Sequence, residues 1–335
     1  MYKDDIIISV VMVTYNHEEY LKQAIESILM QQVNFNYEIV IGEDCSPDNS
    51  RRILREFENR YPGKFNIVYR NKNIGPTKNL YDLFTKCNGK YVAILEGDDY
   101  WTDFNKLKMQ VDFMEGQSEY SGTCHIVSII DKYNEVVGNI PTREFINRNR
   151  LSEIENIDRY IEYIYEETGQ GIHVQSLVFK NIFSSNDDSE KIKKLLTTTN
   201  YVSDIQTIAL ILRYGKIKFI DKNMGRYRRI IKEGNTSYSS QGAMTSYLET
   251  INSWKLIDEY YELKFHGEIN NVIFKYKAIY IFKLLRNKDF KNIKFIFECD
   301  TIEDKIKFFV YISSFIIKKI QKKLKIKLKE SWLSK

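Results

Sequence analysis

Residues 6–29, IIISVVMVTYNHEEYLKQAIESIL, join a short apolar run to a segment with a different hydrophobic period. The run from Ile6 to Val13 is rich in β-branched residues, which predicts a strand buried on both faces. After Asn16 the apolar residues recur at the spacing of one helix face, at Leu21, Ala24, Ile25, Ile28 and Leu29. The stretch therefore predicts a strand followed directly by a helix.

The same alternation continues through the first hundred residues. Three further apolar runs predict strands, at 39–41, 65–69 and 91–95, with helical spacing between them. Strands that alternate with helices form a mostly parallel sheet with helices on both faces, so the fold class is α/β. Ligands bind such sheets beyond the carboxyl ends of the strands. We therefore expect the ligand-binding and catalytic side chains just after the strands, at residues 14–16, 43–44, 71–75 and 96–99.

Composition narrows the class of protein. The chain has 335 residues, of which 43% are hydrophobic and 28% charged. This composition excludes a disordered chain, and the length predicts one large domain plus an appendage, or two domains. The four cysteines lack metal-ligand spacing, and the start shows neither a basic n-region nor a small-residue cleavage site. No run of about 18 apolar residues predicts a spanning helix. These features predict a cytoplasmic protein.

The most specific signal is the segment Glu96-Gly97-Asp98-Asp99 after the apolar run at 91–95. Clustered carboxylates repel one another and are costly to desolvate, and a hard divalent cation such as Mg²⁺ or Mn²⁺ removes that conflict. The alternative is a solvated acidic turn. Two other strand ends offer groups for a nucleobase: Asp44 could accept a hydrogen bond or cap a helix, and Tyr15 could stack on the base or pack.

Glycine-rich phosphate loops are missing from the sequence. No Gly-x-Gly-x-x-Gly follows the first strand, and no Gly-x-x-x-x-Gly-Lys-Ser/Thr occurs anywhere. The main sequence evidence for a dinucleotide-dependent dehydrogenase or a P-loop ATPase is therefore missing. We expect a metal ion to neutralise the diphosphate of any bound nucleotide.

Four motifs at matching spacing resemble the family 2 glycosyltransferases, inverting enzymes of the GT-A fold that include bacterial polysaccharide enzymes. They are Val10 to Asn16, the turn Glu43 to Ser50, Asn73-Ile74-Gly75 with Asn79, and Glu96 to Asp99 followed by Lys106, Leu107 and Gln110. The resemblance is strong over residues 6–115 and thinner to about residue 235. Glu43 and Glu96 stand where the family more often has Asp.

The resemblance implies a role for each matching residue. Val13 and Tyr15 would flank the nucleobase, Asp44 would bond the N–H of a base such as uracil, and Lys78 or Asn79 would lie near the nucleotide. Glu96, followed by Gly97, would lie near the ribose. Asp98 would hold the metal ion against the diphosphate, and Asp99 beside it would complete the metal site.

An inverting transfer also requires a general base for the acceptor hydroxyl. The family places an Asp at a helix start about a hundred residues after the metal motif, and Asp204 fits, although a helix N-terminus also favours an acid for its dipole alone. Arginines in Gly225 to Arg229 resemble a late family segment near the diphosphate, but Ile230 stands where that segment often has His. His173 begins an apolar run, Val174 to Phe179, which predicts a strand, and could face the acceptor cleft.

The C-terminal third has helical spacing and a basic end. The predicted organisation is a GT-A domain at 1–235, with a nucleotide-sugar half (1–115) and an acceptor half (116–235), then a helical region at 236–335. Residues 305–335 hold ten Lys and one Glu, a net charge of +9, so residues 1–304 carry −4 of the total of +5. A lysine-edged apolar stripe there predicts contact with an anionic membrane surface, or a helix packed on the domain. No motif indicates nucleic-acid binding.

The leading hypothesis is therefore a metal-dependent inverting glycosyltransferase. It would transfer a sugar from a nucleoside diphosphate sugar, with a UDP-sugar expected, to a glycan or lipid-linked glycan. The reaction would serve cell-surface polysaccharide synthesis at the inner face of the cell membrane. One alternative is a sugar nucleotidylyltransferase, which should show a basic glycine-rich loop after the first strand. The other is a catalytically inactive scaffold of a polysaccharide assembly complex, against which Asp98 and Asp204 argue.

Overall fold

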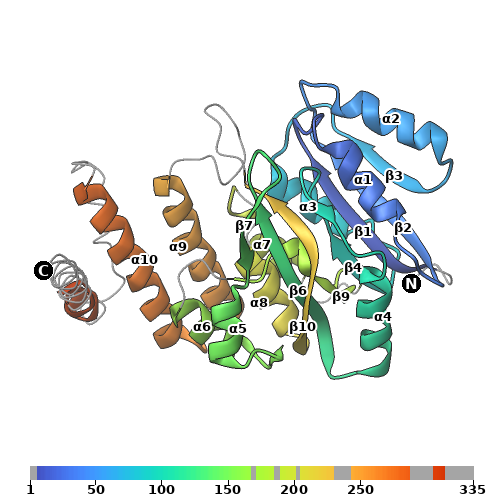
Figure 1. Ribbon diagram of the computed structural model, residues 1–335. Helices are drawn as coiled ribbons and strands as arrows, with labels where there is room; N and C mark the ends of the chain where they lie inside the picture. The colour runs from blue at the N-terminus through green and yellow to red at the C-terminus, as the bar shows by residue number, and fades with distance from the viewer. Residues whose placement is uncertain are drawn as a thin grey trace, which may run out of the picture.

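One sheet runs through the part of the chain that the computed structural model describes, residues 6–166, 171–184, 189–200, 204–229, 243–286 and 305–313 (Figure 1). Its strands lie in the order β3-β2-β1-β4-β9-β6-β10-β5, with β7 beside β6 and β8 beside β10. Their bounds are β1 Ile6–Thr14, β2 Asn36–Glu43, β3 Phe65–Tyr69, β4 Tyr91–Ile94, β5 Tyr100–Trp101, β6 Tyr120–Ile130, β7 Val136–Ile140, β8 Glu153–Ile154, β9 Val178–Lys180 and β10 Lys216–Arg228.

The pairing places the expected strand ends next to one another. β1 pairs in parallel with β2 and β4, β2 pairs in parallel with β3, and the long strands β6 and β10 are also parallel. The antiparallel pairs involve the short strands β5, β7, β8 and β9. Beyond the paired residues, Asp44 N donates to Thr14 O and Gly97 N donates to Val13 O, both at 3.0 Å. The predicted mostly parallel α/β sheet is confirmed.

Helices cover both faces of the sheet, as predicted. In β1, Ile8, Val10 and Met12 enter one core, while Val11 and Val13 enter the other. The first core is completed by α1 Leu21–Leu29, α2 Ser50–Arg60 and α4 Lys106–Gly116. The second is completed by α3 Pro76–Phe84, α5 Arg143–Asn149, α6 Ile157–Glu166, α7 Ser189–Thr197, α8 Asp204–Leu212, α9 Ala243–Tyr260 and α10 His266–Arg286.

Within the region predicted to be helical after residue 235, the helices α9 and α10 pack against the sheet domain. α9 and α10 lie side by side at the end of the molecule opposite β3 (Figure 1), and Trp254 and Ile269 share a core with strand residues. A helical segment at 305–313 follows, in which Phe308 packs on Phe274 with ring centroids 5.5 Å apart. The predicted stripe from Ile317 to Trp332 lies outside the described residues. Among the described helices, none combines the length and apolar character needed to span a membrane.

The strand expected over Val174 to Phe179 is corrected by the structure. Residues Val174–Ser176 form a 3₁₀ helix, η1, and the strand β9 begins only at Val178. Local hydrogen bonds turn the chain: Ser176 N and Oγ both donate to His173 O, at 2.9 and 2.7 Å. Such side-chain bonds to the backbone compete with strand pairing. The apolar pattern alone did not reveal this turn.

Candidate active site

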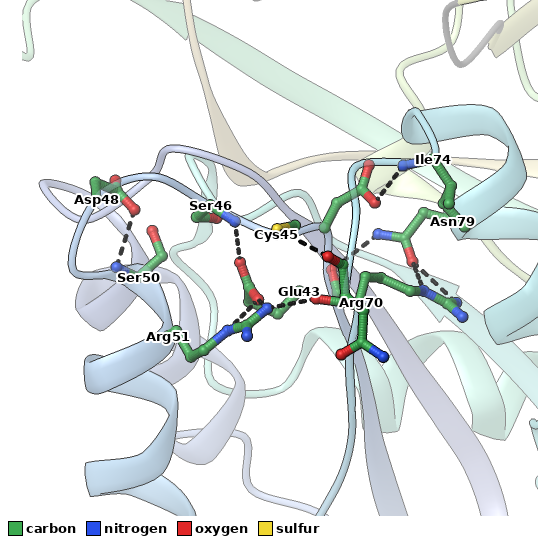
Figure 2. Close-up of polar contacts among 12 residues, drawn as sticks. Glu43, Cys45, Ser46, Asp48, Ser50, Arg51, Arg70, Ile74 and Asn79 are labelled. Carbon is green, nitrogen blue, oxygen red and sulfur yellow. Dashed lines mark hydrogen bonds and ion pairs between the residues drawn. The ribbon is translucent and has the colours of Figure 1, made fainter.

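The turn after β2 is held by a buried carboxylate (Figure 2). Glu43 is fully buried, and its Oε1 accepts a hydrogen bond from Ser46 N at 2.5 Å. Its Oε2 accepts one from Arg51 Nε at 2.7 Å, and Arg51 Nη2 reaches Arg70 O at 2.7 Å. Glu43 thus ties the turn to α2 and to the end of β3. Both of its oxygens are used inside the protein, so this residue acts as a brace.

Asp44 and Asn79 join the ends of β2 and β3 to α3. The two oxygens of Asp44 accept from Ile74 N and Gly75 N, each at 2.9 Å, and the side chain is buried. Asn79 Nδ2 donates to Gly42 O at 2.9 Å. A Cβ at Gly42 would come within 2.3 Å of Asn79 Oδ1, so any larger residue there would displace the Asn79 amide. These contacts make Asn79 a support beneath the site. Each Asp44 oxygen already accepts one hydrogen bond, so a nucleobase N–H could bond only to the lone pairs that Ile74 N and Gly75 N do not use.

Two of the remaining nucleotide candidates are accessible from the surface and one is buried. Tyr15 is partly exposed just after β1, and Lys78 is exposed on the first turns of α3. Val13 is buried in β1, with its carbonyl bonded to Gly97 N. A Cβ at Gly97 would meet both Thr14 Oγ1 and His17 Nδ1 at 2.8 Å. The glycine therefore lets the 96–99 segment, named here the carboxylate loop, approach β1.

Acidic side chains from distant segments gather at the carboxylate loop. Burial raises the pKa of Glu96 to about 8, helped by the negative charges of Asp98 and Asp204. Burial raises the pKa of Asp99 well above its usual range, and the negative charges of Asp98 and Glu96 raise it further. Asp204, which lies 105 positions after Asp99 in the chain, is thus close enough to Glu96 to perturb it electrostatically. The structure brings together the predicted metal site and the predicted base.

Within that group Asp98 and Asp99 face different partners. Asp98 Oδ2 lies 3.8 Å from His17 Nε2, at the partly exposed side of the loop. Asp99 is buried, and its Oδ1 accepts from Arg228 N at 2.8 Å. Ligand atoms of Glu96, Asp99 and His173 lie within 4.8 Å of one another, close enough to hold one metal ion. The assignment of Asp98 to the metal stays a prediction.

Asp204 begins α8 and is held by backbone donors. Its carboxylate accepts from its own N–H and from Val174 N–H, which favours the ionised form, but burial dominates and raises the pKa to about 7. His173 is also buried, and burial lowers its pKa to about 3, so its ring is neutral at physiological pH. A carboxyl group with a pKa near 7 is well matched to accept a proton from a hydroxyl during a reaction near neutral pH.

The donor set fits a hard divalent cation. Glu96 and Asp99, with Asp98 as predicted, would supply oxygen ligands, which Mg²⁺ and Mn²⁺ prefer, and His173 would add a neutral imidazole that Mn²⁺ accepts. The raised pKa values of Glu96 and Asp99 show the cost of packing these carboxylates without a neutralising charge. A bound cation would remove that cost.

Arg228, one of the late arginines, makes its contacts inside the protein. Arg228 Nε donates to Asp98 O at 3.0 Å, Nη1 to Asn134 Oδ1 at 2.5 Å and Nη2 to Gln23 Oε1 at 2.9 Å. Its guanidinium also lies over the Tyr20 ring, 4.5 Å from the centroid. Arg228 therefore holds the carboxylate loop, a function that the sequence pattern did not indicate. Gln175 was likewise missed, although a glutamine inside an apolar run is a signal for a buried polar contact.

Comparison with known proteins agrees with this geometry. Residues 9–179 match the family described as Glycosyl transferase family 2. An uncharacterized protein of Mycobacterium tuberculosis is 38% identical over 122 residues, 36% of this chain and 35% of that protein. The putative teichuronic acid biosynthesis glycosyltransferase TuaG of Bacillus subtilis is 32% identical over 112 residues, covering 33% and 43%. Each alignment thus spans less than half of the relative's own length.

One further relative and one solved structure extend the comparison. The Escherichia coli enzyme WfgD, named as a UDP-Glc:alpha-D-GlcNAc-diphosphoundecaprenol beta-1,3-glucosyltransferase, is 28% identical over 150 residues, covering 44% of this chain and 56% of that protein. The structure of S. aureus TarS 1-349 with UDP-GlcNAc superposes with a TM-score of 0.50 at 14% identity, over 87% and 90% of the two chains, which shows a shared GT-A fold. With the family match over half of its length, the chain belongs to glycosyl transferase family 2.

Proposed function

We propose that the protein is an inverting glycosyltransferase that uses a nucleoside diphosphate sugar, with UDP as the preferred nucleotide. The acceptor is a hydroxyl of a glycan in cell-surface polysaccharide or oligosaccharide synthesis. One observation carries the proposal. Asp204, a carboxyl group with a pKa of about 7, lies within electrostatic reach of Glu96 on the carboxylate loop. A proton acceptor thus stands beside the group of carboxylates that suits a metal-bound diphosphate.

The proposed reaction is a single displacement at the anomeric carbon of the donor sugar. The acceptor oxygen forms a bond to that carbon as the bond to the diphosphate oxygen breaks, and the configuration inverts. Asp204 takes the proton of the acceptor hydroxyl, and the nucleoside diphosphate leaves with the bonding electron pair. Val174 N–H and the first turn of α8 hold the Asp204 carboxylate in place for this transfer.

Glu96, Asp98, Asp99 and His173 are the residues that would hold Mg²⁺ or Mn²⁺. When bound, such an ion neutralises charge that builds up on the departing diphosphate. The protein itself contributes the fixed loop, because Arg228 and Gly97 hold residues 96–99 against β10 and β1. A preorganised loop needs little rearrangement during the reaction, which is how such sites lower a barrier.

The nucleotide lies, in this proposal, across the ends of β1 and β2. Tyr15 stacks on the base, Val13 and Asp44 line its edge, and Lys78 approaches the nucleotide from α3. Asn79 holds the backbone at Gly42, two residues before Asp44. A UDP-sugar is favoured by two relatives: WfgD is named for UDP-Glc, and TarS was solved with UDP-GlcNAc.

The acceptor is proposed to be a lipid-linked glycan at the inner face of the cell membrane. The WfgD name contains a diphosphoundecaprenol acceptor, and TuaG is named for teichuronic acid synthesis. Exposed apolar side chains at Ile306, Phe309 and Val310, together with the charge of +9 over 305–335, suit an anionic lipid surface. Co-sedimentation with vesicles of neutral lipid, and of neutral lipid with phosphatidylglycerol, tests this. Equal binding to both would contradict the electrostatic contribution.

The function is tested by binding followed by turnover. A thermal-shift screen against UDP-, GDP- and dTDP-sugars with Mn²⁺ should identify the donor, and calorimetry with UDP should show binding that EDTA weakens. Turnover with that donor should be lost in Asp98→Ala and in Asp204→Asn, while Asp204→Asn still binds UDP. Full turnover in Asp98→Ala would contradict the metal role. Full turnover in Asp204→Asn would contradict the base.

A further inference from the structure

Gln175 is a buried glutamine whose amide spans two parts of the site. It is fully buried in η1, and its Nε2 donates to Asp99 Oδ2 at 2.8 Å and to Arg226 O at 3.0 Å. A backbone carbonyl only accepts hydrogen bonds, so Arg226 O determines that the amide nitrogen, not the oxygen, faces Asp99. Because Asp99 Oδ1 accepts a hydrogen bond from Arg228 N, both oxygens of Asp99 are bonded to residues of the acceptor half.

The same short turn also reaches Asp204. Val174 N–H donates to the Asp204 carboxylate, and the neighbouring residue, Gln175, holds Asp99. The turn is itself fixed, because the indole N–H of Trp101 donates to Gln175 O at 3.1 Å. Two consecutive residues of η1 thus contact the predicted base and a carboxylate of the metal site. Any shift of η1 would change the separation of those two groups.

Gly225 leaves the space that the Gln175 amide occupies. A Cβ at Gly225 would come within 2.5 Å of Gln175 Oε1 and 3.6 Å of His125 Cε1. The backbone of Gly225 is not left-handed, so the need for glycine comes from space and not from conformation. β10 therefore carries a residue whose small size allows the contact between Gln175 and Asp99.

We propose that Gln175 is a positioning residue for glycosyl transfer, which acts through Asp99 to hold the carboxylate loop at a set distance from Asp204. The inference rests on the proposed function and adds to it a residue outside the reacting groups. Gln175 touches no substrate in this role. Outer groups that orient metal ligands commonly change metal affinity or activity 10–100-fold when removed, as a rough guide.

Gln31 provides a matched control. It is also a buried glutamine, and its Nε2 donates to Asp103 O at 2.7 Å while its Oε1 accepts from Leu107 N at 3.0 Å, with no carboxylate oxygen and no residue of η1 among these partners. Gln175→Met and Gln31→Met each replace a buried amide by an apolar chain of similar length. Both should lower the melting temperature by similar amounts. Only Gln175→Met should lower kcat, about 10–100-fold, with a smaller change in the donor KM.

A third variant tests the same contact from the opposite strand. Gly225→Ala should displace the Gln175 amide and lower kcat like Gln175→Met. The apparent affinity for Mn²⁺ alone, measured by electron paramagnetic resonance, should fall in both variants and stay near the wild-type value in Gln31→Met. Equal losses of kcat in the two glutamine variants would overturn the positioning role.

The outcomes also separate this inference from the proposed function. If the wild type turns over no donor, the proposed function fails, and the Mn²⁺ affinities of the four proteins decide the positioning role by themselves. Equal Mn²⁺ affinities in wild type, Gln175→Met and Gly225→Ala would then overturn it. If Gln175→Met does not fold, Gly225→Ala carries the test, and wild-type kcat in that variant would overturn the inference.

Discussion

Replacing the proposed base Asp204 by asparagine should stabilise the protein above neutral pH while it abolishes turnover. Burial raises the pKa of the Asp204 carboxyl group from 3.8 to about 7. Above pH 7 the group is ionised in both the folded and the unfolded states, and burial then destabilises the folded state. Below about pH 4 it is protonated in both, and the penalty is absent.

The size of the effect follows from the pKa difference. Once ionised, a carboxyl group whose pKa rises from 3.8 to about 7 on folding lowers the free energy of unfolding by roughly 4 kcal/mol. At pH 4.5 the same group lowers it by only about 1 kcal/mol. The asparagine cannot ionise, and the hydrogen bonds it loses are lost at both pH values. The gain in stability of Asp204→Asn should therefore be about 3 kcal/mol larger at pH 8 than at pH 4.5.

The assay is urea denaturation of both proteins at pH 8 and pH 4.5. EDTA is present throughout, because a bound cation would neutralise the cluster. Asp112→Asn is the matched control, since Asp112 is 54% exposed on α4 and paired with Lys108. Its effect should differ little between the two pH values. If the gain of Asp204→Asn is the same at pH 8 and pH 4.5, the ionised base has no burial cost and the reasoning is refuted.

Three further predictions concern the same strand ends. Wild-type kcat/KM should fall about tenfold per pH unit below pH 7, because protonated Asp204 cannot accept the hydroxyl proton, and a flat profile from pH 5 to 8 would contradict this. Arg51→Met should lower the free energy of unfolding by about 3 kcal/mol, because it leaves Glu43 buried without its cation. Arg52→Met, which removes an exposed pair with Glu56, should cost below about 0.5 kcal/mol, and equal losses measured in urea would refute the distinction. Cys45 has a left-handed backbone with φ of 61°, so Cys45→Gly should raise stability by about 1 kcal/mol in the same assay, and a loss would show that the thiol contributes more than the strain.

Much of the fold could be predicted because its signals are local. The apolar run from Ile6 to Val13 and the helical spacing after it predicted β1 and α1, and the run at 65–69 coincides with β3. Parallel pairing then placed Thr14, Asp44 and Gly97 at one edge of the sheet, as expected for α/β proteins. The 173–179 segment was mispredicted because the hydrogen bonds of His173 and Ser176 outweighed its apolar pattern.

Sequence by itself determined which residue types stand at the strand ends, since hydrophobic period and motif spacing are properties of a continuous segment. Tertiary structure alone decided what those residues contact. Asn79 became a support because Gly42 and Arg70 approach it, and Asp99 met Gln175 across 76 positions of the chain. The burial of Asp204, and with it the raised pKa of this group, comes from segments that meet only when the chain has folded. Such partners leave no fixed spacing in the sequence, because packing between distant elements brings them together.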